Sequence, residues 1–356
     1  MRFDLPRTGV LAAIGRELGS TPVLLLVAPR GGGKSHLLKR LFDETRARGA
    51  PSALVQLEPV SGSPEMLDSE LSRLAGPILG RVAASGTPAF DSLLRRLKDR
   101  RPSATLFLDD VTEIRTLSYY PGVEEPLDKF LAAVESGGRA VLTSRFSYWM
   151  ARRFPELTVR SIPRVSAAEL AEAGASEAEL IASASAGITV HAVSLAESLE
   201  DGAGSVAIAL AQELSPGGRI EAECRATLSE LLHRARGYGA CKTVLHVLSD
   251  QEGLKLTEVA RRVDRTPGAT RDYLRWLEEV DLIAVREKRF YFVDPVLRVW
   301  SRIYARGTPP GADDIRREVE GYLEGLTPLT PLPMNAPEDK VLAFTLPAPR
   351  REDFID

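Results

Sequence analysis

Five short apolar runs alternate with helical patterns over the first 163 residues. The apolar runs lie at 23–27, 52–57, 105–110, 139–145 and 157–162. Apolar residues at helical spacing occupy 8–18, 36–42, 61–100 (as two helices) and 146–154. Continuous apolar runs of this length are typical of parallel strands that are buried on both faces. The alternation therefore predicts an α/β fold, a doubly wound parallel sheet with helices on both sides.

The strand pattern stops at residue 166, and helical patterns follow at 166–173, 176–186, 190–200, 203–214 and 219–236. Ser166 and Glu169 have the spacing of a capping box, which marks the start of a helix. Glycines break the later patterns, as at Gly187 and at 216–218. Residues 164–236 are therefore expected to form a small helical domain.

A third unit occupies residues 237–306. Helical patterns at 242–248, 257–263 and 269–280 lead into a stretch at 284–293 that predicts a two-stranded hairpin, and a further helix is expected at 294–306. Three helices followed by a hairpin are typical of a winged helix-turn-helix domain. The segment 307–356 is expected to form one helix near 312–325 and a proline-rich tail.

The first apolar run ends in a glycine-rich loop that leads directly into a helix, with the sequence APRGGGKSH at 28–36. Glycines let consecutive backbone N–H groups point at phosphate oxygens, and the helix N-terminus adds its positive end. Ala28 replaces the first glycine of the standard pattern, which fits only if this position needs no positive φ. We expect a phosphate-binding loop whose nucleotide-binding residues are Pro29, Arg30, Gly31, Gly32, Gly33, Lys34, Ser35 and His36.

Two carboxylates, Asp109 and Asp110, end the apolar run at 105–110. In a phosphate-loop protein this strand carries the acidic side of a Mg²⁺ site, where Ser35 would ligate the metal and Asp109 would hold it through water. Lys34 would reach the β- and γ-phosphates of ATP, and Asp110 would polarise the attacking water. The pattern predicts Mg²⁺-dependent hydrolysis of ATP, with Lys34 and Asp110 as catalytic residues.

Three polar residues, Thr143, Ser144 and Arg145, end the run at 139–145. The carboxyl ends of neighbouring parallel strands meet at one edge of a sheet, where doubly wound folds bind their ligands. We therefore expect one of these three side chains to sense the γ-phosphate.

Basic residues mark the predicted third helix and hairpin of the winged unit, and the helix would enter the major groove while the hairpin contacts phosphates. The same helix carries Asp272, Glu278 and Glu279, which would oppose a phosphate backbone, so a protein-binding module remains an alternative. A second basic run, at 95–101, is interpreted as a solvated helix end, with nucleic-acid contact as the alternative. The candidate DNA-binding residues are Arg265, Arg271, Arg275, Arg286, Lys288 and Arg289.

Composition narrows the classes of function. A net charge of -3 excludes a generally basic nucleic-acid coat, although it allows a local basic face. Cys224 and Cys241 are the only cysteines, too few for a disulfide framework or a Cys-rich zinc site, and this fits a reducing cytosol. The chain opens without an apolar signal region, and no apolar run approaches ~18 residues, so we expect a cytoplasmic protein with no membrane partner. The four histidines show no metal-ligand spacing, and no Ser/Cys–His arrangement is evident.

The order of phosphate loop, Asp-Asp strand, helical segment and winged unit resembles AAA+ and STAND-type P-loop ATPases. The segment DPVLRVW at 294–300 is similar to one that ends the winged helix in the archaeal-type ATPase family. The resemblance covers residues 1–306 and departs from the pattern at Ala28, at Asp110 in place of a usual Glu, and after Gly187, where a Gly-x-Pro is missing. It implies a P-loop nucleotide-binding domain at 1–163, a helical lid at 164–236, a winged helix at 237–306 and a C-terminal helix and tail at 307–356.

The segment Arg152-Arg153-Phe154-Pro155 falls where AAA+ proteins carry an arginine finger, and origin-recognition-type initiators have a similar segment. Such a residue reaches the γ-phosphate of a neighbouring subunit and neutralises charge in the transition state. The resemblance thus implies that Arg152 or Arg153 is catalytic in trans and that the protein is a homo-oligomer. A pair of solvated arginines is the alternative.

Together these features predict an ATP-binding and hydrolysing switch whose nucleotide state controls assembly and the exposure of a winged helix that binds duplex DNA. Two alternatives remain open at this point. One is a signalling ATPase whose winged helix binds a protein partner, and the other is a nucleotide-binding scaffold without turnover.

Overall fold

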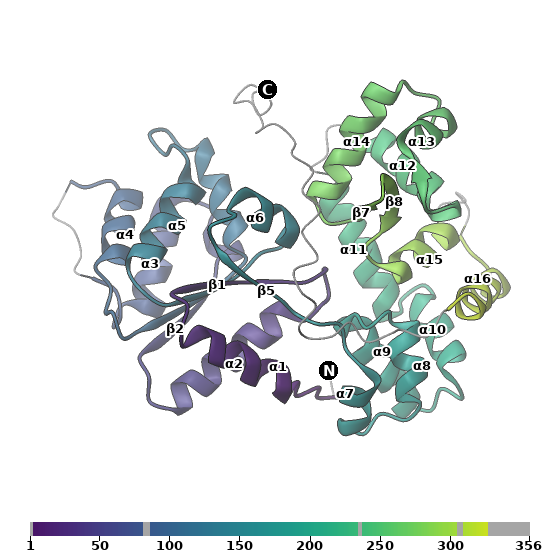
Figure 1. Ribbon diagram of the computed structural model, residues 1–356, viewed down its shortest axis with the longest axis horizontal. Helices are drawn as coiled ribbons and strands as arrows, with labels where there is room; N and C mark the ends of the chain where they lie inside the picture. Colours follow the sequence, from purple (N-terminus) through teal and green to yellow (C-terminus); the bar gives the residue numbers. More distant parts are fainter. Residues whose placement is uncertain (1–2, 81–85, 234–236, 305–308, 327–356) are drawn as a thin grey trace.

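The computed structural model describes residues 3–80, 86–233, 237–304 and 309–326 of the chain. Figure 1 shows a central sheet with its helices in the left half of the view and the helices of the C-terminal half on the right. We call β1–β5 with α1–α6 the sheet unit. The helices α7–α11 form the helical unit, and α12–α15 with β6–β8 form the C-terminal unit.

Five parallel strands form the central sheet in the order β2-β3-β4-β1-β5, which confirms the predicted α/β fold. β1 lies between β4 and β5, so strands that follow it in the sequence lie on both of its sides. The crossover connections therefore run in both directions along the sheet. The carboxyl ends of β1, β3 and β4 consequently meet at one edge. The bounds are β1 Val23–Val27, β2 Ser52–Gln56, β3 Thr105–Asp109, β4 Ala140–Thr143 and β5 Thr158–Ser161.

Alternate side chains of each strand enter two separate cores. On β1, Leu24 and Leu26 pack with α1 and α2, whereas Leu25 packs on the opposite face with α3–α6. Both faces are covered, which explains why the strands are apolar throughout. The helices are α1 Thr8–Leu18, α2 Lys34–Ala47, α3 Pro64–Ala75, α4 Ala89–Lys98, α5 Pro126–Ser136 and α6 Ser147–Arg153.

Residues 111–138 received no prediction, yet they contain a 3₁₀ helix, η2 Val111–Tyr119, and α5. A second short 3₁₀ helix, η1 Glu58–Val60, was also missed. The apolar residues of α5 recur at helical spacing, as Leu127, Phe130, Leu131 and Val134, and all are buried. This periodicity was available in the sequence.

The interpretation of the basic run 95–101 as a solvated helix end was wrong for two of its arginines. Arg96 is buried and pairs with Asp68 at 2.9 Å. Arg100 is only 2% exposed and donates to the backbone oxygens of Leu97 at 3.1 Å and Gly138 at 2.7 Å. Both guanidinium groups are engaged by acceptors within the sheet unit and are not exposed on its surface.

The helical and C-terminal units share one hydrophobic core, which includes Leu195, Leu210, Leu245 and Leu277. The predicted capping box is present at the start of α7, where Ser166 accepts from the N–H of Glu169. The helical unit consists of α7 Ala167–Glu172, α8 Ala178–Ala184, α9 Thr189–Glu200, α10 Val206–Leu214 and α11 Arg219–His233.

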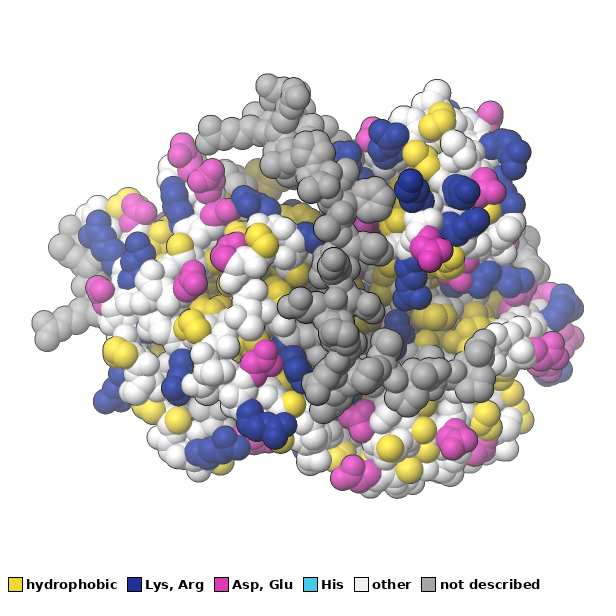
Figure 2. All heavy atoms as spheres, in the orientation of Figure 1, with side chains coloured by type: hydrophobic (Ala, Val, Ile, Leu, Met, Phe, Trp, Pro, Cys, Tyr) yellow, Lys and Arg dark blue, Asp and Glu magenta, His cyan; other side chains and the backbone are white. Residues whose placement is uncertain are grey.

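The C-terminal unit has the helices α12–α15 and a three-stranded antiparallel sheet in the order β6-β8-β7, of which β6 was not predicted. Figure 2 shows Lys and Arg side chains gathered over this unit, at the upper right. No helix among the described residues is long and apolar enough to cross a bilayer. The predicted tail lies outside the described residues. The elements are α12 Tyr238–Asp250, β6 Leu254–Lys255, α13 Leu256–Arg262, α14 Pro267–Glu279, β7 Ile283–Arg286, β8 Arg289–Phe292, α15 Pro295–Tyr304 and, after the unit, α16 Ala312–Glu324.

Candidate nucleotide site

The loop between β1 and α2 has the backbone of a tight glycine turn. Gly31 has φ 72° and Gly33 has φ 86°, conformations that L side chains rarely adopt. A Cβ at Gly32 would lie 2.9 Å from the Cβ of Ala28, so this position also needs glycine. Ala28 itself has no positive φ and is buried. The departure from the standard pattern at Ala28 therefore costs the loop no backbone strain.

Lys34, the first residue of α2, is held against its own loop. Its Nζ donates to the backbone oxygens of Ala28 at 2.8 Å and Pro29 at 3.2 Å. Burial lowers the pKa of Lys34 to about 8, although the negative charges of Asp281 and Asp110 act in the opposite direction. The ammonium group is therefore poorly solvated. An anionic phosphate would be a stronger partner for it than these two carbonyl oxygens.

Oxygen ligands meet where β3 and β4 end beside the loop. The hydroxyl of Ser35 donates to Oδ1 of Asp109 at 3.0 Å, and the hydroxyl of Thr143 donates to the same oxygen. Mg²⁺ takes one or two protein oxygens together with phosphates and waters, so Ser35 and Asp109 fit this metal. No cluster of three or more His, Cys, Asp or Glu that could hold a metal occurs among the described residues.

Asp110 is fixed by three donors. Its Oδ1 accepts from the hydroxyl of Thr112 at 2.8 Å and from the N–H of Arg145 at 3.0 Å, and its Oδ2 pairs with Nε of Arg145 at 3.0 Å. The backbone at Asp110 is also left-handed, with φ 60°. The carboxylate therefore has a set orientation, with one acceptor position of Oδ2 left over for a water molecule.

The guanidinium group of Arg145 pairs with carboxylates of η1, η2 and α11 and with that of Asp110, between β3 and η2. It pairs with Glu58 at 2.9 Å, with Asp110, with Glu113 at 3.8 Å and with Glu230 of α11. Burial alone would lower the pKa of Arg145, but the hydrogen bond to Glu58 and the charges of Asp110 and Glu230 raise it above the ordinary value. Of the three expected sensors, only Arg145 carries a charge.

The other two expected sensors have different surroundings. Thr143 orients the metal side of the site, because its hydroxyl contacts Asp109 and accepts from the N–H of Asp110 at 3.0 Å. Ser144 is buried and accepts from the N–H of Phe146 at 3.0 Å, so its hydroxyl stabilises the turn into α6.

The start of α9 covers the phosphate loop, a contact that the sequence analysis missed. The N–H of Val190 donates to the backbone oxygen of Gly31 at 2.9 Å, and a Cβ at Gly31 would lie 2.5 Å from Cγ1 of Val190. The hydroxyl of Thr189 lies 3.1 Å from the Cβ position of Gly33, and it has no hydrogen-bond partner among the described residues. Gly187, with φ 65°, makes the turn that brings this segment over the loop and was the available signal.

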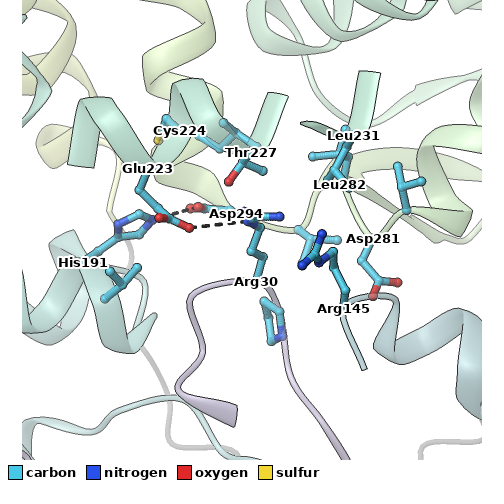
Figure 3. A pocket seen from close by; sticks show the side chains of 15 residues that line it. Arg30, Arg145, His191, Glu223, Cys224, Thr227, Leu231, Asp281, Leu282 and Asp294 are labelled. Atoms are coloured by element: carbon cyan, nitrogen blue, oxygen red, sulfur yellow. Dashed lines mark hydrogen bonds and ion pairs between the residues drawn. The ribbon is translucent and has the colours of Figure 1, made fainter. Parts of the chain in front are cut away.

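A cavity lies between the phosphate loop and the other two units, and Figure 3 shows the side chains that line it. Arg30 reaches across to α11, pairing with Glu223 at 3.4 Å and Glu230 at 2.9 Å. His191 is buried and its Nε2 lies 2.8 Å from Oδ2 of Asp294, the Asp of the DPVLRVW segment. The pairs of Arg30 around the cavity link the loop to the helical unit, and the His191–Asp294 pair links the helical unit to the C-terminal unit.

The His–Asp pair beside Cys224 was not evident in the sequence, because its members lie on α9, on α11 and at the start of α15. Although burial opposes it, His191 holds the pKa of Asp294 below its usual range. Burial raises the pKa of the Cys224 thiol well above its ordinary value, and the thiol is therefore protonated near neutral pH and unsuited to nucleophilic attack.

The two candidate finger arginines form ion pairs within their own chain. Arg152 pairs with Glu278 of α14 at 2.8 Å, and Arg153 pairs with Asp128 of α5 at 2.8 Å. About half of the Arg153 side chain is exposed, at 49%. The candidate DNA-binding residues on α14 and the β7–β8 turn are exposed, except that Arg289 is partly buried and donates to the backbone oxygen of Gly253 at 2.6 Å.

No family model matches this chain, and no curated protein matches its sequence. Among solved structures, the Walker-type ATPase of Pyrococcus abyssi is similar with a TM-score of 0.65 and 17% identity, over 85% of this chain and 96% of that one. The chain has the fold of a Walker-type ATPase. The predicted α/β fold of a P-loop ATPase is therefore confirmed.

Two further structures are less similar. The RuvB Holliday junction branch migration motor of Thermotoga maritima gives a TM-score of 0.40 and 12% identity, over 80% of this chain and 91% of that one. The Orc1 protein of Aeropyrum pernix, solved in complex with DNA, gives a TM-score of 0.40 and 13% identity, over 90% and 92%.

Proposed function

We propose that the protein binds ATP with Mg²⁺ and hydrolyses the γ-phosphate. The observation that carries this proposal is the contact of Ser35 with Asp109 at 3.0 Å, directly beside the glycine loop and Lys34. The glycine loop with its backbone N–H groups, the ammonium group of Lys34 and two oxygen ligands converge there. A Mg²⁺-nucleotide requires all three kinds of group. The Walker-type ATPase fold supports the same conclusion.

In the proposed reaction Lys34 leaves the carbonyl oxygens of its loop and binds the β- and γ-phosphates. Ser35 and Asp109 would hold Mg²⁺, which neutralises charge on the β- and γ-phosphate oxygens when bound. Arg145 gives up a contact with Asp110 and turns to the γ-phosphate. Asp110 then orients a water molecule and accepts its proton while the water oxygen bonds to phosphorus and ADP leaves.

A DNA-binding winged helix in the C-terminal unit is the second part of the proposal. Lys and Arg side chains gather on the face seen in Figure 2, and those that would meet a phosphate backbone include the exposed Arg271 and Arg286. Of the three acidic side chains on α14 that would oppose DNA, Glu278 is engaged by Arg152 and Glu279 is partly buried. Only Asp272 is fully exposed, so this face carries a positive balance.

We further propose that nucleotide binding changes the assembly state, with Arg152 or Arg153 reaching the site of a neighbouring subunit. Both arginines lie at the end of α6 and form exposed or half-exposed ion pairs, which are weak enough to exchange for a phosphate.

The proposal is tested by measuring the molecular mass with and without a non-hydrolysable ATP analogue, and repeating the measurement with duplex DNA. We expect a larger assembly with the analogue and salt-dependent DNA binding. Arg271→Ala or Arg286→Ala should weaken DNA binding and reduce the salt slope by about one. Arg316→Ala, on the exposed face of α16, is the control and should not.

DNA binding that is absent at low salt, or unchanged by both substitutions, contradicts the DNA part. Capture of a protein partner through the same face would then favour the signalling ATPase.

A further inference from the structure

The helix α11 presents two carboxylates to the phosphate loop. Glu223 and Glu230 are seven positions apart, which places them on one face of the helix, two turns from each other. Oε1 of Glu223 pairs with Nε of Arg30 at 3.4 Å, and Oε2 of Glu230 pairs with Nη1 of Arg30 at 2.9 Å. Figure 3 shows the first of these pairs across the cavity. A side chain of the glycine loop is therefore attached to the helical unit.

Glu230 bridges two arginines of the nucleotide edge. Its other oxygen, Oε1, pairs with Nη1 of Arg145, which follows β4 at the edge of the sheet where doubly wound folds bind their ligands. The side chain of Arg145 is 13% exposed and that of Glu230 is 26% exposed, so water and salt screen this contact only in part. One carboxylate of α11 thus neutralises an arginine of the glycine loop and an arginine at the end of β4.

Arg145 is already surrounded by anions. Its ion pairs with Glu58, Asp110, Glu113 and Glu230 place four carboxylates around one guanidinium group. A γ-phosphate would bring further negative charge, and like charges repel strongly where solvent is sparse. A triphosphate that reaches Arg145 must therefore replace one of these carboxylates.

Of the four carboxylates, that of Glu230 comes from outside the sheet unit. The other three belong to η1, to η2 and to the turn between β3 and η2, all of which stay with the sheet. On α11, Leu231 and Leu232 directly follow Glu230 and are buried in the core that the helical and C-terminal units share. Replacement of Glu230 at Arg145 is therefore the exchange that can be transmitted to those two units.

We propose that Glu230 occupies the place of the γ-phosphate at Arg145 and Arg30, so that a nucleoside triphosphate displaces it and a diphosphate does not. This inference rests on the proposed function, because it needs a nucleotide on the glycine loop. It makes Glu230 a specificity-determining residue of that site. With a diphosphate bound, Glu230 keeps both arginines and α11 stays on the loop. With a triphosphate bound, the arginines turn to the γ-phosphate and α11 separates from the sheet unit.

Equilibrium binding of two probes to the full chain, a non-hydrolysable ATP analogue and ADP, tests this role. Glu230→Gln removes the competing charge with little change of shape. The affinity for the analogue should rise about fivefold or more, whereas the affinity for ADP should change by less than about twofold. Loss of a merely structural contact would change both affinities alike.

Glu221→Gln is the matched control. It removes the same charge from α11, but its partner, Arg225, lies on the same helix, so both affinities should stay as in the wild type. The inference is overturned if Glu230→Gln shows no selective gain for the analogue, or if Glu221→Gln shows the same gain.

Distances between spin labels give a readout in a chain that keeps Glu230. Ala132→Cys on α5 and Ala226→Cys on α11 place the labels at exposed positions, whereas Cys224 and Cys241 are buried. The distance distribution should shift with the analogue and not with ADP. A distribution that is the same for the two nucleotides overturns the inference.

Failure of the proposed function gives a different pattern. In that case neither nucleotide binds the wild type, or both bind Lys34→Ala as well as they bind the wild type. If both nucleotides require Lys34 and Glu230→Gln shows no selective gain, the proposed function stands and this inference alone fails.

Discussion

The hydroxyl of Ser35 and the carboxylate of Asp109 meet at 3.0 Å, although 74 positions separate them in the sequence. The parallel order of β3, β4 and β1 brings the two residues to one edge of the sheet. Ser35 is the second residue of α2 and Asp109 is the last residue of β3, so neither segment could form the contact by itself. The proposed metal-nucleotide site rests on this contact.

Ser35→Ala and Asp109→Asn should weaken the dependence of nucleotide binding on Mg²⁺. Loss of one ligand or of its orientation is expected to raise the half-saturating Mg²⁺ concentration by about 10- to 100-fold. Titration of Mg²⁺ at a fixed concentration of ATP analogue measures this. Ser136→Ala, an exposed serine at the end of α5, is the control. Identical Mg²⁺ curves for Ser35→Ala and the control would exclude Ser35 as a ligand.

Nucleotide affinity should depend on pH through Lys34. The pKa of Lys34 without nucleotide is about 8, in surroundings that include Asp281, Asp110, Asp109 and Arg30, and bound phosphates raise it. Binding therefore takes up a proton at high pH. The affinity should fall by up to about tenfold per pH unit above pH 8, and Lys34 should contribute no slope well below that value, where it is charged in both states.

Isothermal titration of the analogue between about pH 7 and 9.5 checks this slope. Lys34→Arg keeps its charge over this range, and whatever binding it retains should lack the slope. An affinity in the wild type that is constant up to the highest pH contradicts the role of Lys34.

Gly31→Ala should displace the start of α9 from the phosphate loop. The new Cβ would lie 2.5 Å from Cγ1 of Val190, in addition to the strain of φ 72°. Gly49→Ala is a matched control, because Gly49 has φ 75° but no atom within 4 Å of the Cβ position. The control should lose about 1 kcal/mol of stability from backbone strain alone, and Gly31→Ala should lose more.

Adding Val190→Ala to Gly31→Ala should recover part of that difference, since the clashing methyl group is removed. Thermal unfolding of the two single variants, the control and the double variant measures the recovery. Equal stability losses at Gly31 and Gly49 would mean that Val190 does not press on the loop.

Arg152→Ala or Arg153→Ala should lower ATP turnover by at least about 100-fold if either residue completes the site of a neighbouring subunit. Mixing the inactive arginine variant with Lys34→Ala should restore activity, because each mixed interface contains one intact site. Glu278→Gln and Asp128→Asn break the same ion pairs and keep the arginines, so they control for lost structure. Full turnover in both arginine variants removes the shared site.

The sequence predicted the strands and the loop because their signals are local. Five apolar runs, a glycine turn at 31–33 and a carboxylate pair at 109–110 are each readable within a few positions. The order of the strands in space was not predicted, and it is what unites Ser35, Asp109 and Thr143. Parallel packing of distant segments follows from tertiary contacts that no single window contains.

The missed parts of the site have the same cause. Val190 and Thr189 reach the glycine loop from more than 150 positions away, and Asp281 of the C-terminal unit lines the cavity together with Pro29 and Arg30 of the loop. Arg96 looked like a surface charge because its partner, Asp68, lies on another helix. In each of these cases the side chain is ordinary in its own segment, and only its partner gives it a role.

Release of phosphate from Mg²⁺-ATP by the full chain tests the central claim most directly. The wild type should release phosphate, Lys34→Ala should neither bind nor hydrolyse, and Asp110→Asn should bind with unchanged affinity but turn over about 100-fold more slowly or less. Equal rates for Asp110→Asn and the wild type, or phosphate release that survives Lys34→Ala, would contradict the assignment of this site as an ATPase centre.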